Sequence, residues 1–134
     1  MGDDSTGLPR PELERLYREA VYRVALPGGT AEFRIGERLE GAPGPFALIT
    51  AWNPGSRPLP PAENDRRNAE LAAMLRGMGA RLLPAEGASP DGSYREASFA
   101  AFGITAEQAI EAARAFGQAA IAWHDGEGAR LLWC

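Results

Sequence analysis

The chain has 134 residues, of which 45% are apolar and 24% are charged, as is typical of one soluble globular domain. Its net charge of −4 argues against a nucleic-acid-binding protein, which would need basic residues to neutralise phosphates. All 14 basic residues are arginine, which excludes Schiff-base chemistry, a phosphate-loop lysine and a lysine general base. We expect a disordered lead-in over residues 1–9 and a single domain over residues 10–134.

The cysteine and histidine content excludes several kinds of site. Cys134 is the one cysteine and His124 the one histidine, so a disulfide within the chain and a structural zinc site both lack ligands. The acidic residues are dispersed, without the spacing of a metal or glycosidase site, and we expect neither metal nor cofactor. The apolar runs are too short to span a membrane, and residues 1–9 lack the apolar region of a signal peptide. We therefore expect a cytoplasmic protein with no membrane contact.

The N-terminal part of the chain predicts a helix followed by a β-hairpin. Apolar residues at positions 13, 16 and 17 share one face of a helix over residues 12–20. Residues 21–26 alternate as a strand, Pro27-Gly28-Gly29 turns the chain, and residues 31–35 return.

The central part predicts a buried strand, a proline-rich loop and a long helix. Residues 46–51 are almost all apolar, which is the pattern of a strand buried on both faces. The helix over residues 62–77 carries Leu71, Leu75 and Met78 on its apolar face.

The C-terminal part predicts four strands and one helix. Two strands, 81–85 and 93–102, flank a loop over residues 87–92. Thr105 and Gln108 predict the capping box of a helix that runs to about residue 116. The last two strands are expected at 118–124 and 129–133, joined by a turn, with His124 as a solvated hairpin residue.

The order of these elements predicts the fold class. From residue 46 to residue 124 it reads strand, helix, strand, strand, helix, strand, the split βαβ order of ferredoxin-like folds. We expect an α+β domain with a single mixed β-sheet and helices packed on one face. The N-terminal hairpin and a C-terminal strand would extend that sheet.

Three polar side chains, Asn64, Arg67 and Asn68, lie at the start of the long helix, on or beside the face that later enters the core. Burying a polar group there without a partner costs roughly 1–3 kcal/mol. Two interpretations stay open. The side chains either hydrogen-bond the backbone of the loop that precedes the helix, or line a ligand cleft where the buried strand ends.

Further candidates surround this cluster. Trp52 offers a ring or apolar surface, although a tryptophan at a strand end is more often packing at the edge of the core. Glu96 and Ser98 share a strand face and would join the cluster if their strand neighbours the buried one. Gln118 follows Gly117, which is expected to cap the preceding helix, so the Gln118 side chain is expected to satisfy backbone groups.

The chain also resembles a known family. The residues that carry the resemblance are, in order, Ile49-Thr50-Ala51-Trp52-Asn53-Pro54, Glu63-Asn64, Asn68, Leu71, Glu96, Ser98-Phe99, Phe116-Gly117-Gln118 and Ala120-Ile121. The series is similar to a bacterial family known only as a domain of unknown function, over about residues 17–132. The resemblance implies a small stand-alone bacterial protein and supplies no activity, cofactor or catalytic residue. Ala119 and Ala97 depart from the pattern, which usually has asparagine and a second acidic residue there. These departures weaken the contribution of Glu96 and Gln118 to any site.

Two functions follow as hypotheses. The first is a small-molecule binding domain for a polar or anionic ligand, with a cleft between the loop 52–57 and the helix 62–77. The expected ligand-binding residues are Trp52, Asn53, Asn64, Arg67, Asn68, Glu96, Ser98 and Gln118. Arg67 would bind an anionic group, and Glu96 is the one acid–base candidate if the protein is an enzyme.

The second hypothesis is a non-catalytic protein-interaction or dimerisation module, in which the polar cluster is structural. The hairpin 21–35 or the strand 129–133 would offer a sheet edge for pairing, with a homodimer as one outcome. Leu132 and Trp133 would then be interface residues.

Overall fold

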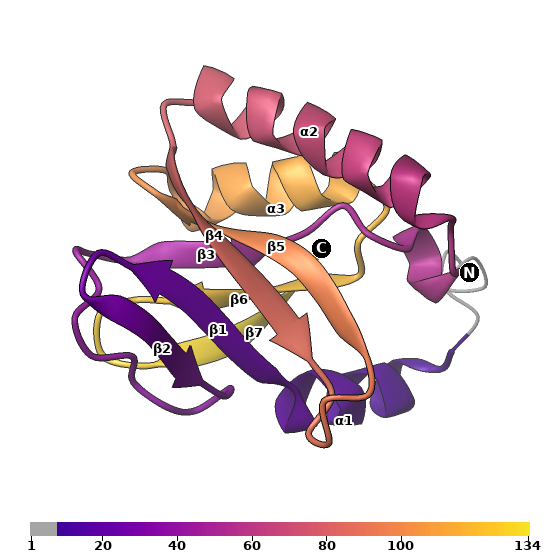
Figure 1. Ribbon diagram of the computed structural model, residues 1–134, viewed down its shortest axis with the longest axis horizontal. Helices are drawn as coiled ribbons and strands as arrows, with labels where there is room; N and C mark the ends of the chain where they lie inside the picture. Colours follow the sequence, from indigo (N-terminus) through magenta and orange to yellow (C-terminus); the bar gives the residue numbers. More distant parts are fainter. Residues whose placement is uncertain (1–7) are drawn as a thin grey trace.

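One curled, seven-stranded antiparallel sheet is the frame of the computed structural model, which describes residues 8–134 (Figure 1). The strands are β1 (Val21–Leu26), β2 (Gly29–Phe33), β3 (Phe46–Ile49), β4 (Arg81–Ala88), β5 (Arg95–Phe102), β6 (Ala120–His124) and β7 (Ala129–Trp133). Their order across the sheet is β2-β1-β4-β5-β3-β6-β7. Residues 1–7 of the predicted lead-in lie outside the described range.

Every neighbouring pair of strands is antiparallel, so the prediction of a mixed sheet is wrong. The strands β3 and β4 run in the same direction, but β5 lies between them. The strands β5 and β6 likewise run in the same direction on either side of β3. Each helical crossover therefore returns the chain two positions away, and the strand between is antiparallel to both neighbours.

Helices cover both faces of the sheet. In Figure 1, α2 (Pro61–Gly77) and α3 (Ala106–Ala115) lie above the sheet and α1 (Arg10–Glu19) lies below it. The expectation that the helices pack on one face is therefore wrong for α1. Only Ala20 separates α1 from β1, and the Tyr22 hydroxyl donates a hydrogen bond to the Tyr17 carbonyl oxygen at 3.0 Å. These two links hold α1 on the sheet face to which Tyr22 points.

The alternation of side chains along the strands builds two apolar cores. In β3, where all four residues are buried as predicted, Ala47 and Ile49 pack with the residues of α2 and α3. Phe46 and Leu48 point to the opposite face, into a second core with residues of β1, β2 and β5. The side chains of this second face, which α1 partly covers, are those that surround the site described below.

Several local predictions are confirmed. Thr105 accepts a hydrogen bond from the Gln108 backbone, and the Gln108 side chain returns one to the Thr105 N–H, so the capping box is present. Gly117 ends α3 in a left-handed conformation with φ of +73°. The strand β4 is longer than predicted and ends at Ala88, and the 3-10 turn η2 (Pro54–Ser56) was not predicted.

His124 is buried, at 1% exposure, so the prediction of a solvated hairpin residue is wrong. Its ring stacks on Phe46 with a centroid separation of 5.1 Å and an interplanar angle of 9°. Its Nε2 accepts a hydrogen bond from the Leu39 N–H at 3.0 Å. Leu39 lies in the segment between β2 and β3, which is distant from His124 in the sequence but contacts its ring in the fold. Burial lowers the pKa of His124.

Candidate functional site

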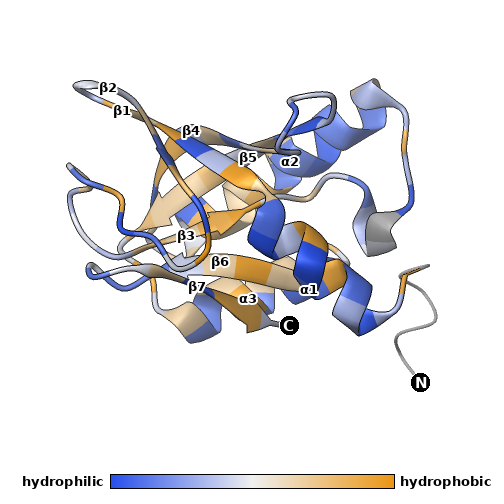
Figure 2. Ribbon diagram, turned by 90° about the horizontal axis from the view of Figure 1, so that it is seen from below, coloured by the Kyte–Doolittle hydropathy of each residue, from blue (hydrophilic) through white to orange (hydrophobic). Residues whose placement is uncertain are grey.

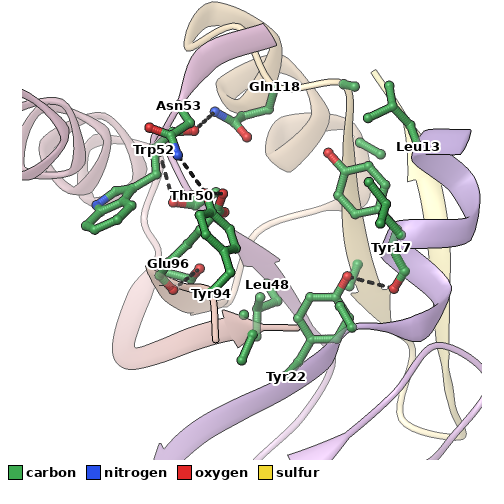
Figure 3. A pocket seen from close by; sticks show the side chains of 18 of the residues that line it. Leu13, Tyr17, Tyr22, Leu48, Thr50, Trp52, Asn53, Tyr94, Glu96 and Gln118 are labelled. Atoms are coloured by element: carbon green, nitrogen blue, oxygen red, sulfur yellow. Dashed lines mark hydrogen bonds between the residues drawn. The ribbon is translucent and has the colours of Figure 1, made fainter. Parts of the chain in front are cut away.

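A cavity of about 420 Å³ lies between α1 and the sheet, on the face opposite α2 and α3 (Figures 2 and 3). Leu13, Leu16 and Tyr17 line it from α1, and Tyr22 and Leu48 line it from the sheet. Figure 2, seen from the α1 side, shows apolar strand segments behind this helix. The volume is within the range of pockets that bind small molecules, about 300–1,000 Å³.

Small residues on the sheet leave this space open. Ala88, Ala120 and Ala122 are buried at the cavity wall, and Gly87 lies beside Tyr22. A Cβ atom at position 87 would lie 3.4 Å from the Tyr22 ring, so the ring packs directly over the glycine. Larger side chains on these strands would fill the space beneath α1.

The helix α1 is held over the cavity at both of its ends. Leu13 is 5% exposed, and the Arg10 guanidinium lies 4.1 Å from the centroid of the Trp133 ring. Tyr17 makes an edge contact with the same ring, with a centroid separation of 6.2 Å. Trp133, the expected interface residue of the second hypothesis, therefore packs against α1.

The polar end of the cavity is a chain of three side chains. Asn53 Nδ2 donates a hydrogen bond to the Tyr94 hydroxyl oxygen at 2.6 Å, and the Tyr94 hydroxyl donates to Glu96 Oε2 at 2.5 Å. In Figure 3 these three residues and Thr50 lie on one side of the cavity, while Leu13, Tyr17 and Tyr22 lie on the other. The hydroxyl of Tyr94 fixes the position of the Glu96 carboxylate.

Glu96 is half-buried and has no cationic partner within residues 8–134. By contrast, Glu86 on the neighbouring strand β4 makes ion pairs with Arg23 and Arg95, each at 2.8 Å. Burial raises the pKa of Glu96, and the hydrogen bond from Tyr94 opposes that rise. The pKa of Tyr17 is also raised, first by burial and then by the charge of Glu96.

Replacing Glu96 with glutamine should raise the free energy of unfolding at pH 7.5 and change it little near pH 4. Because the pKa of Glu96 is higher in the folded than in the unfolded state, folding favours the protonated carboxyl. Its contribution becomes unfavourable as the pH rises from the unfolded pKa through the folded one. Urea unfolding at the two pH values measures this, with the exposed Glu111→Gln as the charge-matched control. A Glu96→Gln variant less stable than the parent at pH 7.5 would contradict the expectation.

Asn68 and Arg67 hold the end of strand β3. Asn68 Oδ1 accepts a hydrogen bond from the Ala51 N–H at 2.8 Å, and Asn68 Nδ2 donates to the Ala97 carbonyl oxygen at 2.9 Å. Arg67 donates to the carbonyl oxygens of Ala51, at 2.9 Å, and Phe116, at 2.6 Å. These side chains satisfy backbone groups, as the first of the two open interpretations proposed, and they are not among the residues that line the cavity.

Asn64 and Asn53 are joined by two hydrogen bonds, and this pair is called the clamp below. Asn64 Oδ1 accepts from the Asn53 N–H at 2.9 Å, and Asn64 Nδ2 donates to Asn53 Oδ1 at 2.8 Å. Asn53 has a left-handed backbone, with φ of 45°, which asparagine tolerates better than most residues. The clamp therefore fixes an unusual turn that presents the Asn53 side chain to Tyr94.

Gly117 and Gln118 fasten the other side of this turn. The Gly55 N–H donates to the Gly117 carbonyl oxygen at 2.9 Å, and a Cβ atom at position 117 would lie 2.9 Å from Pro54 Cβ. Gln118 Nε2 donates to the Trp52 carbonyl oxygen at 3.0 Å, so its predicted backbone role is confirmed. Trp52 Nε1 is buried and has no hydrogen-bond partner within residues 8–134.

The structure thus divides the predicted site residues into two groups. Those that line the cavity are Trp52, Asn53, Glu96, Ser98 and Gln118. Asn64, Arg67 and Asn68 instead lie behind the turn and position it. The predicted site residues did not include Tyr94, which lies just before β5 and lines the cavity. Its alternation with Glu96 and Ser98 in the strand predicted over residues 93–102 was the available signal. Sequence reasoning also missed the wall formed by α1, for which no local signal exists.

The described residues hold neither a candidate metal cluster nor a candidate membrane-spanning helix. Within 8–134, histidine, cysteine, aspartate and glutamate side chains nowhere gather in a group of three that would suit a metal ion. No helix in that range is long and apolar enough to cross a membrane.

The fold and the cavity together define a small α+β domain with a ligand-sized space on one face of its sheet. Residues 49–121 match the family described as "Protein of unknown function (DUF3293)". The match covers more than half of the chain, so the chain belongs to this family, and the resemblance to a domain of unknown function is confirmed. No curated protein and no solved structure matches significantly.

The matched range includes the residues of the polar end but not α1. It contains the turn at Asn53, the clamp from α2, Glu96 and Gln118. The α1 wall of the cavity lies outside it.

Proposed function

We propose that the protein binds a small amphipathic molecule in the cavity between α1 and the sheet. The observation that carries this proposal is a space of about 420 Å³ with leucine and tyrosine side chains along its walls and a fixed carboxylate at one end. Apolar walls supply most of the affinity of such pockets, and a few fixed polar groups orient the ligand. The proposal keeps small-molecule binding from the first hypothesis, replaces its polar or anionic ligand with an amphipathic one, and moves the site to the other side of the loop 52–57.

The charges around the cavity favour a ligand that is not an anion. The charged side chains that line it are Glu19 and Glu96, and no arginine lines it within residues 8–134. Arg67, which the sequence assigned to an anionic group, donates instead to the carbonyl oxygens of Ala51 and Phe116. A bound carboxylate or phosphate would therefore meet two acidic residues without a compensating cation.

A thermal-shift screen of small amphipathic compounds tests the proposal when it is paired with a filled cavity. Ala120→Leu adds volume at a buried position that lines the cavity, whereas Ala97→Leu adds the same volume at an exposed position that does not line it. A compound at 100 times its dissociation constant should stabilise the parent by about 2.7 kcal/mol.

The stabilisation should disappear in Ala120→Leu and persist in Ala97→Leu. Stabilisation that is equal in the two variants would place the binding elsewhere and contradict the proposal. A screen in which no compound stabilises the parent would contradict it as well.

The second hypothesis, a protein-interaction or dimerisation module, draws support from the two edges of the sheet. Strands β2 and β7 lie at these edges. Gly36 and Glu37 hydrogen-bond the backbone of Ala129 at the start of β7, and within residues 8–134 no other strand pairs with the outer side of β2 or of β7. A concentration-dependent dimer in sedimentation velocity, weakened by proline at an edge position such as Leu131, would support this function.

We also propose that residues 46–124 form a ferredoxin-like split βαβ unit. Support comes from the position of β5 between β3 and β4 and of β3 between β5 and β6. A cytoplasmic location and a bacterial origin remain proposals from the sequence.

A further inference from the structure

We propose that the molecule bound in this cavity has a cationic end, such as a protonated amine, and that Glu96 binds that end. The inference rests on the proposed function and narrows its ligand class. Three features of the polar end support it: an unpaired carboxylate, a free amide oxygen and a fixed hydrogen-bond chain.

The first feature is the carboxylate of Glu96. It lies half-buried at the cavity wall, and its one side-chain hydrogen bond within residues 8–134 comes from the Tyr94 hydroxyl. A carboxylate withdrawn from water without a counter-charge is unfavourable, and a nearby cation removes much of that cost. Glu19, the other carboxylate at the cavity, already has Arg15 at 3.6 Å and is exposed. Glu96 is therefore the carboxylate that a cationic group of the ligand would pair with.

The second feature is the side-chain amide of Gln118. Its Nε2 lies 3.0 Å from the Trp52 carbonyl oxygen and 3.4 Å from the Phe116 carbonyl oxygen. Because only the NH₂ group can donate to two carbonyl oxygens, the remaining atom must be the acceptor Oε1. This oxygen has no hydrogen bond within residues 8–134, and the side chain extends toward the cavity in Figure 3. An ammonium group, with three N–H donors and no acceptor, matches such acceptors.

The third feature is the direction of the hydrogen bonds behind Glu96. Asn53 Oδ1 accepts from the Leu59 N–H and from Asn64 Nδ2, so its own Nδ2 must face Tyr94. The Tyr94 oxygen receives this bond, and its single O–H is directed to Glu96 Oε2. Glu96 Oε1 stays available, and the carboxylate is preorganised as an acceptor. The rings of Tyr17 and Tyr94 at the cavity add faces that attract cations.

Three probes that share one apolar body test the inference: 4-phenylbutylammonium, 4-phenylbutanol and 4-phenylbutyrate. Isothermal titration should show that the ammonium compound binds the parent protein at least about tenfold more tightly than the alcohol, because a charge-assisted hydrogen bond is about twice as strong as a neutral one. The butyrate should bind more weakly than the alcohol.

Two glutamine variants with the same change in net charge locate the effect. Glu96→Gln should reduce the preference for the ammonium compound over the alcohol to less than about threefold, since a neutral acceptor replaces the charge. Glu111→Gln, on the exposed face of α3, should leave the preference unchanged.

The outcomes separate this inference from the proposed function. If the alcohol binds the parent as tightly as the ammonium compound, or if the preference survives in Glu96→Gln, the inference is wrong while the cavity remains a binding site. If none of the three probes binds the parent, the inference and the proposed function both fail.

Discussion

Replacing Asn68 with alanine should lower the free energy of unfolding by about 1–3 kcal/mol. The side chain is buried and satisfies both the Ala51 N–H and the Ala97 carbonyl oxygen. Its removal leaves the Ala51 N–H without a partner, which costs about 1–3 kcal/mol, whereas the Ala97 carbonyl oxygen keeps its hydrogen bond from Thr50 Oγ1 at 2.7 Å. Urea unfolding at neutral pH measures the loss, with Glu70→Ala on the exposed face of the same helix as the control.

The Asn68→Ala variant also tests whether the side chains of α2 that hold the turn at Asn53 are needed for binding in the cavity. Because Asn68 holds the chain just before Trp52 and Asn53, its loss should weaken the binding of any compound that stabilises the parent. A variant within about 0.5 kcal/mol of the parent, the range of ordinary surface substitutions, would contradict the structural role of this side chain.

Replacing His124 with alanine should lower the free energy of unfolding by about 3–5 kcal/mol, the range for removing a large buried ring. The substitution empties the space against Phe46 and leaves the Leu39 N–H without its acceptor. Chemical denaturation at pH 7.5 measures the effect. His124→Phe keeps the ring but not the acceptor, so it should fall between the parent and His124→Ala.

The pH dependence of the free energy of unfolding distinguishes the loss of a titrating imidazole from a simple loss of buried volume. Because the pKa of His124 is lower in the folded than in the unfolded state, the unfolded state binds the proton more readily. The contribution of His124 to stability is therefore complete above the unfolded pKa and decreases as the pH falls from there through the folded pKa. The difference between parent and His124→Ala should be smaller at pH 5.5 than at pH 7.5, and a difference that grows on acidification would contradict this account.

Local patterns in the sequence predicted much of the secondary structure. The alternation in β1 and the apolar run at Phe46–Ile49 depend on neighbouring residues, and so does the capping box at Thr105. The polar cluster on α2 was also visible, because helix periodicity places Asn64 and Asn68 on or beside the face that enters the core, where amide groups need hydrogen-bond partners.

The features that the sequence did not predict, the burial of His124 and the position of α1, depend on packing between residues far apart in the chain. The burial of His124 depends on Leu39, which lies 85 residues away in the chain. The cavity depends on α1 crossing to the face opposite α2, and helix periodicity does not specify which face of a sheet a helix covers. The sequence therefore named five residues that line the cavity, Trp52, Asn53, Glu96, Ser98 and Gln118, and none from the α1 wall.

The most direct test of the amphipathic-cation site is a methyl NMR titration of the leucine-labelled protein with 4-phenylbutylammonium. Leu13, Leu16 and Leu48 line the cavity, whereas Leu71 and Leu75 are buried in the core on the α2 face. We expect saturable shifts of the methyl signals of Leu13, Leu16 and Leu48, with little change at Leu71 and Leu75. Unshifted signals from the three cavity leucines, or saturable shifts confined to Leu71 and Leu75, would contradict it.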